Sequence, residues 1–288
     1  RTNLMRTRIS STSMSQGNPM SKEYHAAKAT PDDRFRPVSK STLWASDKSP
    51  WKWANNFGNE KPTAAMQFGS CVHILALEEE KRDDLIAVSE FDSFRTKEAK
   101  QWRKEAEETG KIILTKKEYE TALLMATRAV TMLVRALGHD DYETEVEVAS
   151  EFNDVKICGL IDVVGQDAGG NRLWDIKTCS SIGDERSLQR TMFDFGYHVQ
   201  AALYADMYSA THGDMLAPPD FGFIFVESKY PHETTWVAMS DEAMAAGRAK
   251  YIQLIERWKR YRDTEIHLLP KSVEPGFVMD APQWALPV

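Results

Sequence analysis

Two long segments of the chain carry apolar residues at helical spacing. In residues 63–79 the apolar positions recur every three or four residues, which predicts a core helix. Residues 115–137 carry a similar apolar stripe, preceded by a possible capping box of Thr115 and Glu118 and followed by Gly138. We therefore predict a second long helix there, and we expect it to cover a sheet.

The period then changes to two. Residues 142–149 alternate between polar and apolar, residues 155–164 form a nearly continuous apolar run, and residues 172–178 follow a Gly-Gly-Asn turn. Three consecutive strands joined by short turns are the simplest interpretation.

The last third of the chain carries both helical and strand patterns. We predict a helix over residues 197–210, strands over 221–227 and 234–239, and a last helix that Ser240 caps and that runs to about Arg262. Helices before and after a mixed sheet indicate an α/β domain.

The pattern shows no internal repeat and no linker that would divide the domain. We expect a leader over residues 1–20, disordered or left over from cloning, then a single domain over 21–270 and a tail over 271–288. Residues 37–62 are rich in Pro, Ser, Lys and Trp, which favours short helices and loops. Packing on the domain is the favoured role of the tryptophans in this segment, ahead of contact with a partner: Trp44, Trp51 and Trp53.

Composition excludes several classes of protein. With 288 residues, of which 42% are hydrophobic, the chain can bury a sizeable core, and its apolar runs are too short for a membrane-spanning helix. The first twenty residues lack the apolar centre of a signal peptide, so we expect a soluble, cytoplasmic protein that makes no membrane contact. The three cysteines form no CxxC pair, which argues against a disulfide, zinc or iron-sulfur framework.

The net charge of −7 is unfavourable for DNA binding, because affinity for DNA comes mainly from Lys and Arg that neutralise phosphates. Net charge averages over all faces, however. Basic residues cluster in residues 95–104 and at Arg186 and Arg190, and we expect the latter two to contact DNA.

One short pattern carries candidate chemistry. Period-two alternation places Asp175 and Lys177 on one face of a strand, with Ile176 on the other. Asp162 lies thirteen residues before Asp175 in the preceding apolar strand, where an unpaired charge would be costly. Two acids on adjacent strands of a hairpin predict a site for Mg²⁺, with Mn²⁺ as a substitute, and the Ile176 carbonyl is a possible further ligand.

Hydrolysis of a phosphodiester requires a nucleophilic water and neutralisation of charge on the phosphate, and these groups meet both needs. We expect Lys177 to have a lowered pKa and to orient or deprotonate the water. A bare Asp-x-Lys triplet is weak evidence, and taken alone it indicates an ordinary ion pair.

The longer pattern is more specific. Gly159-Leu160-Ile161-Asp162, followed by Trp174-Asp175-Ile176-Lys177-Thr178, resembles the core of PD-(D/E)xK nucleases, and more narrowly the exodeoxyribonuclease VIII (RecE-like) group, which is related to the RecB nuclease domain and phage lambda exonuclease. Residues 68–78 resemble the helix motif of that group, and residues 200–204 resemble its Q-x-x-x-Y motif. Residues 20–25, 39–41 and 49–50 are similar to its N-terminal approach to the core, so the resemblance runs from about residue 20 to 210.

The resemblance implies a restriction-endonuclease-like fold and a role for further residues. It implies that His73 lies at the active site and binds the metal or contacts the phosphate, and that Gln200 and Tyr204 lie near the scissile bond. An acidic residue is also expected before Asp162. Of Glu143, Glu145 and Glu147, which alternation places on one strand face, we choose Glu145.

The resemblance further implies an activity. It implies an exonuclease that degrades one strand of linear duplex DNA, 5′ to 3′, and leaves 3′ single-stranded tails for phage or prophage recombination in a bacterial host. The implied assembly is a ring-shaped homo-oligomer, a trimer or tetramer, that works with a RecT-like single-strand annealing protein. Two alternatives stay open: a PD-(D/E)xK endonuclease and a catalytically inactive DNA-binding module, the latter disfavoured by the intact Asp162, Asp175 and Lys177.

Overall fold

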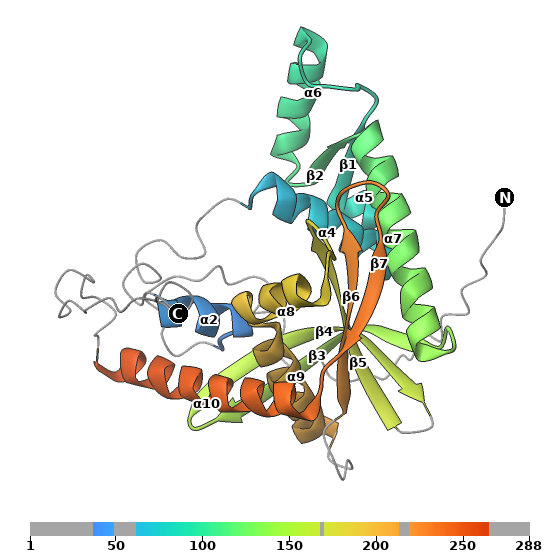
Figure 1. Cartoon of the computed structure of the whole chain (residues 1–288). Coiled ribbons are helices and arrows are strands. Elements are labelled where there is room, and N and C mark those ends of the chain that lie inside the picture. The colour runs from blue at the N-terminus through green and yellow to red at the C-terminus, as the bar shows by residue number, and fades with distance from the viewer. Residues whose placement is uncertain (1–36, 49–61, 168–169, 213–218, 265–288) are drawn as a thin grey trace, which may run out of the picture.

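A five-stranded mixed sheet forms the centre of the protein (Figure 1). The structure is a computed structural model, and it describes residues 37–48, 62–167, 170–212 and 219–264. The strand order is β3-β4-β5-β6-β7, with every pair antiparallel except the parallel pair β5–β6. The strands are β3 (Tyr142–Phe152), β4 (Val155–Asp167), β5 (Gly170–Cys179), β6 (Asp220–Glu227) and β7 (Thr234–Ala238).

Helices cover both faces of this sheet, so the predicted α/β architecture with a central mixed sheet is confirmed. One face packs against α2 (Lys40–Lys48), α9 (Tyr197–His212) and α10 (Asp241–Thr264), and α8 (Glu185–Asp194) precedes α9 in the same layer. The other face packs against α4 (Ala64–Leu77) and α7 (Lys116–Leu137).

The two faces follow directly from alternation along the strands. On β6, Phe221, Phe223 and Phe225 point to the layer of α9 and α10, whereas Ile224 and Val226 point to α4 and α7. All five side chains are buried. Burying an aromatic or branched apolar side chain stabilises the fold by roughly 1.5–3 kcal/mol, so a strand with two apolar faces belongs in the middle of the molecule.

The signals for helix ends are confirmed where the sequence carried them. Thr115 and Glu118 form the capping box of α7, and Gly138 ends that helix with φ 82°, a left-handed conformation that glycine adopts without strain. At the start of α10, the hydroxyl of Ser240 accepts a hydrogen bond from the Ala243 N–H at 3.2 Å.

A small lobe beside α7 was not predicted. After a 3₁₀ turn (Glu79–Lys81) it consists of α5 (Arg82–Leu85), β1 (Ile86–Ser89), α6 (Lys97–Glu108) and β2 (Ile112–Thr115), and β1 pairs with β2 in parallel. Strands of four residues are too short to show a period. Helix α6 buries only Ala99 and Ala106, so its apolar stripe is too narrow to recognise, and α8 was missed for the same reason.

Trp44 on α2 is partly buried against the core, as the packing interpretation requires, whereas Trp51 and Trp53 lie outside the described residues, as do the leader and the tail. The three cysteines are free, two of them fully buried. Within the described residues, no helix combines the length and the apolar character that a bilayer crossing requires.

Candidate active site

The site begins where β4 and β5 part. Their ladder runs from the turn to the pair Val163–Trp174, and Asp162 and Asp175 follow directly on the two strands. Beyond this point the Ile176 N–H donates to the carboxylate of Asp162 at 2.8 Å. The Asp162 side chain thus takes a hydrogen bond from the neighbouring strand, and both aspartates are buried, with 8% and 2% of their surface exposed.

A second irregularity lies across the sheet from Asp162. The β3–β4 register is the same on both sides of Glu145, from Thr144–Val163 to Val146–Ile161, but no pair is formed at Glu145 itself. Its backbone has φ 56°, a left-handed conformation that costs a non-glycine residue free energy. The Glu145 side chain therefore departs from the regular alternation of β3.

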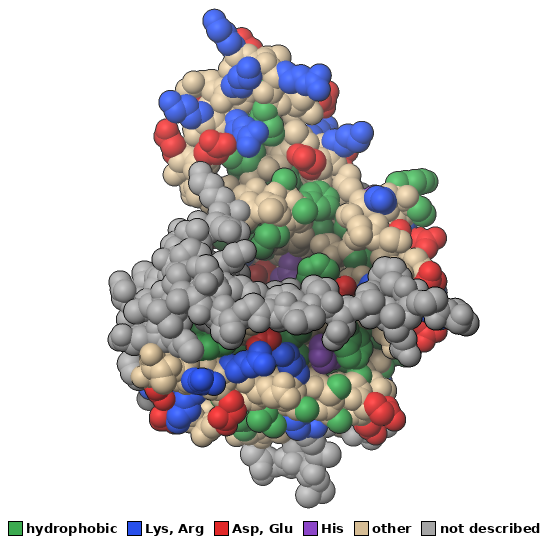
Figure 2. Space-filling view, turned by 60° about the vertical axis from the view of Figure 1, so that its left-hand side comes forward, with side chains coloured by type: hydrophobic (Ala, Val, Ile, Leu, Met, Phe, Trp, Pro, Cys, Tyr) green, Lys and Arg blue, Asp and Glu red, His purple; other side chains and the backbone are tan. Residues whose placement is uncertain are grey.

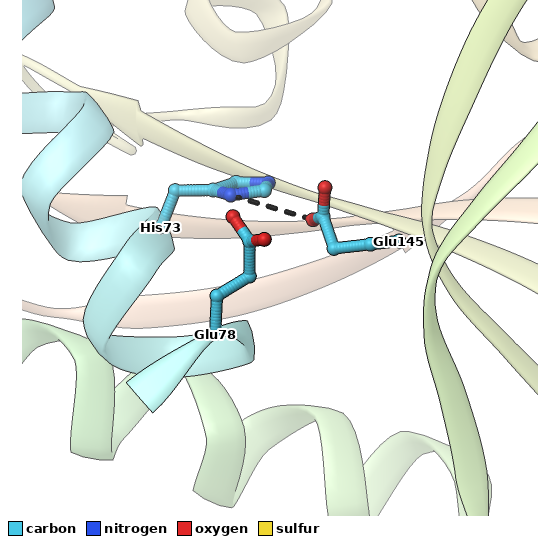
Figure 3. Close-up of side chains that lie close together, drawn as sticks. All are labelled: His73, Glu78 and Glu145. Atoms are coloured by element: carbon cyan, nitrogen blue, oxygen red, sulfur yellow. Dashed lines mark ion pairs between the residues drawn. The ribbon is translucent and has the colours of Figure 1, made fainter. Parts of the chain in front are cut away.

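Helix α4 brings His73 to these two acids. Its Nε2 lies 2.9 Å from Oδ2 of Asp162, and its Nδ1 lies 3.6 Å from Oε1 of Glu145. Figure 3 shows the imidazole extending from α4 toward Glu145, with Glu78 from the end of the same helix pointing to both. Ligand-type atoms of His73, Glu78 and Glu145 lie within 4.8 Å of one another, so this group could hold a metal ion.

Glu78 was not predicted as a site residue. It is the C-cap of α4 and also forms an ion pair with Lys81. Its position five residues after His73, past one turn of helix, gave only a weak signal. Whether the end of α4 reaches β3 depends on how the helix lies on the sheet.

Asp175 is the centre of a second set of contacts. Lys177 Nζ lies 2.5 Å from Oδ2 of Asp175, and the side-chain amide of Gln200, from α9, donates to Oδ1. The ring of Tyr197, at the start of α9, lies 5.2 Å from Lys177 Nζ. The structure thus places Asp175 and Lys177 on the same face of β5, as alternation predicted, and it adds Tyr197, which sequence reasoning had assigned only to the start of a helix.

Burial and nearby charges shift the pKa values of the side chains in the site. Burial raises the pKa of Asp175 to about 6, and the negative charge of Asp162 acts in the same direction. Burial also raises the pKa of Glu145 to about 7. Burial alone would lower the pKa of His73, but the charge and hydrogen bond of Asp162 outweigh it and raise that pKa to about 9.

The expectation of a lowered pKa for Lys177 is wrong. Burial does act to lower it, yet the charges of Asp175 and Asp162 outweigh burial, and the pKa of Lys177 is raised from its ordinary value. The reason is the short contact with Asp175, which stabilises the ammonium form. Lys177 is therefore suited to hold a water or a phosphate oxygen by donating hydrogen bonds, and poorly suited to remove a proton.

The other predicted side chains lie on α9 and α8. Tyr204 is buried with its ring over Gly159 of β4, so close that a side chain on Gly159 would collide with it. Arg186 and Arg190 lie exposed on α8, one helical turn apart. Their roles, and that of the Ile176 carbonyl as a ligand, stay predictions.

Figure 2 shows acidic and histidine side chains in a hollow below the lobe of β1, β2 and α6, whose surface carries both basic and acidic side chains. The donor atoms of the site fit a divalent cation. Burial and the negative charge of Asp162 raise the pKa of Asp175, so a positive charge between the two carboxylates would stabilise their ionised forms. Oxygen-rich sites suit Mg²⁺ and Mn²⁺.

Comparison with known proteins decides the family. The profile of the "PDDEXK-like domain of unknown function (DUF3799)" family matches residues 35–271. The chain belongs to this family. The PDDEXK-like domain also resembles a solved structure titled "Putative exonuclease" from Eubacterium rectale, with a TM-score of 0.57 and 14% identity over 87% of this chain and 91% of that one. At this identity the likeness shows the fold alone.

Two other solved structures align more weakly with this PDDEXK-like domain. SSO0001 has a TM-score of 0.31 and 13% identity over 67% of this chain and 76% of its own, and VC1899 from Vibrio cholerae has a TM-score of 0.20 and 13% identity over 58% and 49%. No curated protein matches the sequence significantly. The family and the fold place the protein in the PD-(D/E)xK superfamily and support a nuclease.

Proposed function

We propose that this protein is a Mg²⁺-dependent exodeoxyribonuclease of the RecE-like group that degrades one strand of linear duplex DNA. The observation that carries the proposal is the position of Asp162 and Asp175. Both are buried where β4 and β5 part, and Lys177 lies 2.5 Å from Asp175. Such a costly arrangement of charges is typical of a site built for catalysis.

Asp162, Asp175, the Ile176 carbonyl and His73 would hold the cation, and Mn²⁺ would substitute for Mg²⁺. When bound, the cation would neutralise charge on the phosphate and favour ionisation of the attacking water. His73 would join this set in its neutral form, because a bound cation would displace the proton that Asp162 stabilises on its ring. Glu145 and Glu78 lie close enough to His73 to contribute.

The remaining side chains position the reactants. Gln200 holds the Asp175 carboxylate through Oδ1 and so fixes its orientation. Lys177, as an ammonium, would donate to the attacking water or to a phosphate oxygen and stabilise the negative charge that develops there. Exposed Arg186 and Arg190 would bind the phosphates of the DNA backbone.

The finer parts of the proposal come from the resemblance of residues 20–210 to RecE-like nucleases. They are 5′ to 3′ polarity, 3′ single-stranded products, a ring-shaped trimer or tetramer, and work with a RecT-like annealing protein in phage or prophage recombination within the bacterial cytoplasm. The double-stranded DNA end is the proposed substrate.

The test compares linear with covalently closed circular duplex DNA, each incubated with protein and Mg²⁺, and then with EDTA. We expect Mg²⁺-dependent loss of the linear form only, with label at the 5′ end released before label at the 3′ end, and no loss with Asp175→Ala. Cutting of circles would favour an endonuclease. Absence of any cleavage would favour a DNA-binding module and overturn the proposal.

A further inference from the structure

The segment that joins α8 to α9 exposes a large aromatic ring close to the candidate site. Phe195, the C-cap of α8, is 59% exposed. Its inner face stacks on Tyr197, with ring centroids 5.9 Å apart and an interplanar angle of 20°. Tyr197 in turn stacks on Phe223 of the central sheet at 5.4 Å, so Phe195 is the outermost ring of a stack that begins in the core.

The backbone around Phe195 is held firmly. The buried Lys40 of α2 donates from Nζ to the Phe195 carbonyl at 2.8 Å. The next residue, Gly196, has φ 65°, and the ring of Trp44 lies so close that a Cβ there would be 2.9 Å from it. The exposed ring is thus mounted on ordered backbone, and binding a ligand to it would cost little conformational entropy.

The stack also leads to the catalytic face of β5. Lys177 Nζ lies 5.2 Å from the Tyr197 ring, on which Phe195 stacks. A ligand lying on the outer face of Phe195 is therefore separated from Lys177 by two rings. In a nuclease that holds the reacting phosphate at Lys177, a base of the strand being cut would fit this position.

Two basic side chains nearby fit the same ligand. Arg186 and Arg190 lie exposed on α8, the helix that Phe195 ends. Single-stranded nucleic acid is commonly bound by this combination, in which cations hold the backbone and aromatic rings stack on the bases.

We propose that Phe195 is a stacking platform for an unpaired base of the DNA strand that enters the active site. The inference rests on the proposed function, and it adds a base-binding residue to it. Because every base has a π-face, the platform favours unpaired nucleotides over paired ones without preference for sequence.

The experiment uses a short single-stranded oligonucleotide that contains 2-aminopurine, whose fluorescence falls when it stacks. The full-length protein carries Asp175→Asn to prevent cleavage, and fluorescence anisotropy measures binding in parallel. We expect quenching on binding, and with Phe195→Ala both loss of the quenching and roughly 5- to 100-fold weaker binding. Phe195→Trp should restore both. In the cleaving protein, Phe195→Ala should raise KM and change kcat by less than about twofold.

Phe193→Ala is the matched control, since Phe193, in the last turn of α8, is 40% exposed but stacks on His198 instead of Tyr197. It should leave quenching and KM unchanged. Cleavage and binding that are the same with Phe195→Ala as without it would overturn the inference while leaving the nuclease intact. A change in oligomeric state with Phe195→Ala, without a change in quenching, would also overturn the inference, because Phe195 would then contact a second copy of the protein. A protein that neither binds nor cleaves DNA would overturn both proposals.

Discussion

The two halves of the β4–β5 hairpin differ in what holds them together. Near the turn, five residue pairs form a regular antiparallel ladder, and Leu173 and Val163 are fully buried on opposite faces. Past Val163–Trp174 the ladder ends, and the same strands carry Asp162, Asp175 and Lys177.

The difference teaches how this fold separates stability from chemistry. In the paired half the two strands bond to each other and bury apolar side chains. In the parted half each strand pairs with its outer neighbour, β3 or β6, instead of with the other, and the space between them holds two buried acids and Lys177, where burial raises the pKa of Asp175 to about 6. Because the two halves belong to the same strands, the paired half fixes the position of the parted half. Substitutions in the parted half should therefore lower activity more than stability, and those in the paired half should lower stability more than activity.

The largest effect is expected from Asp175→Asn. The variant keeps the shape of the side chain but removes a charge from the site, so we expect Mg²⁺-dependent cleavage of linear DNA to fall by at least about a hundredfold. The folded-state pKa of Asp175 lies above its ordinary value, so above about pH 6 the charged form opposes folding. At pH 7.5 in EDTA, the thermal midpoint should therefore be no lower than that of the parent. A midpoint several degrees lower would show that Asp175 mainly stabilises the fold.

In the paired half, a substitution should lower the stability of the fold and leave the activity of the folded protein nearly unchanged. Leu173→Ala leaves a cavity in the core between the sheet and the layer of α9 and α10, and such truncations cost about 2–5 kcal/mol of unfolding free energy. Urea denaturation measures this loss. Cleavage per folded molecule, measured well below the midpoint, should stay within about twofold of the parent. Loss of activity in fully folded protein would mean that the parted half depends on packing in the paired half.

The same contrast explains what the sequence could predict. Long periodic segments identified β3 to β5 and α7, and alternation placed Asp175 and Lys177 on one face. The two strands of a hairpin are neighbours in sequence, so the number of residues between Asp162 and Asp175 was enough to predict that they lie close together.

Contacts between distant elements were beyond such reasoning. The approach of Glu78 to Glu145 depends on how α4 lies across the sheet, and the φ of 56° at Glu145 interrupts an alternation that gave no reason to distinguish it from its neighbours. The direction of the pKa shift of Lys177 was predicted wrongly because it depends on the distance to Asp175. At this short distance the attraction of the carboxylate, which raises the pKa, outweighs burial, which lowers it.

The smallest effect concerns the pH dependence of stability. Asp162 raises the pKa of His73 from 6.5 to about 9, because the charged imidazole is stabilised in the folded protein. This contribution to the unfolding free energy is fully present below about pH 6.5 and is lost as pH rises through 9. In EDTA, the parent should lose about 1–3 kcal/mol of unfolding free energy across this window, and His73→Gln should lack this component. Exposed His212 at the end of α9 offers the control His212→Gln, which should retain the slope. Equal slopes in the parent and His73→Gln would mean that Asp162 does not hold a proton on His73, and that Lys177 is the cation that balances the buried acids.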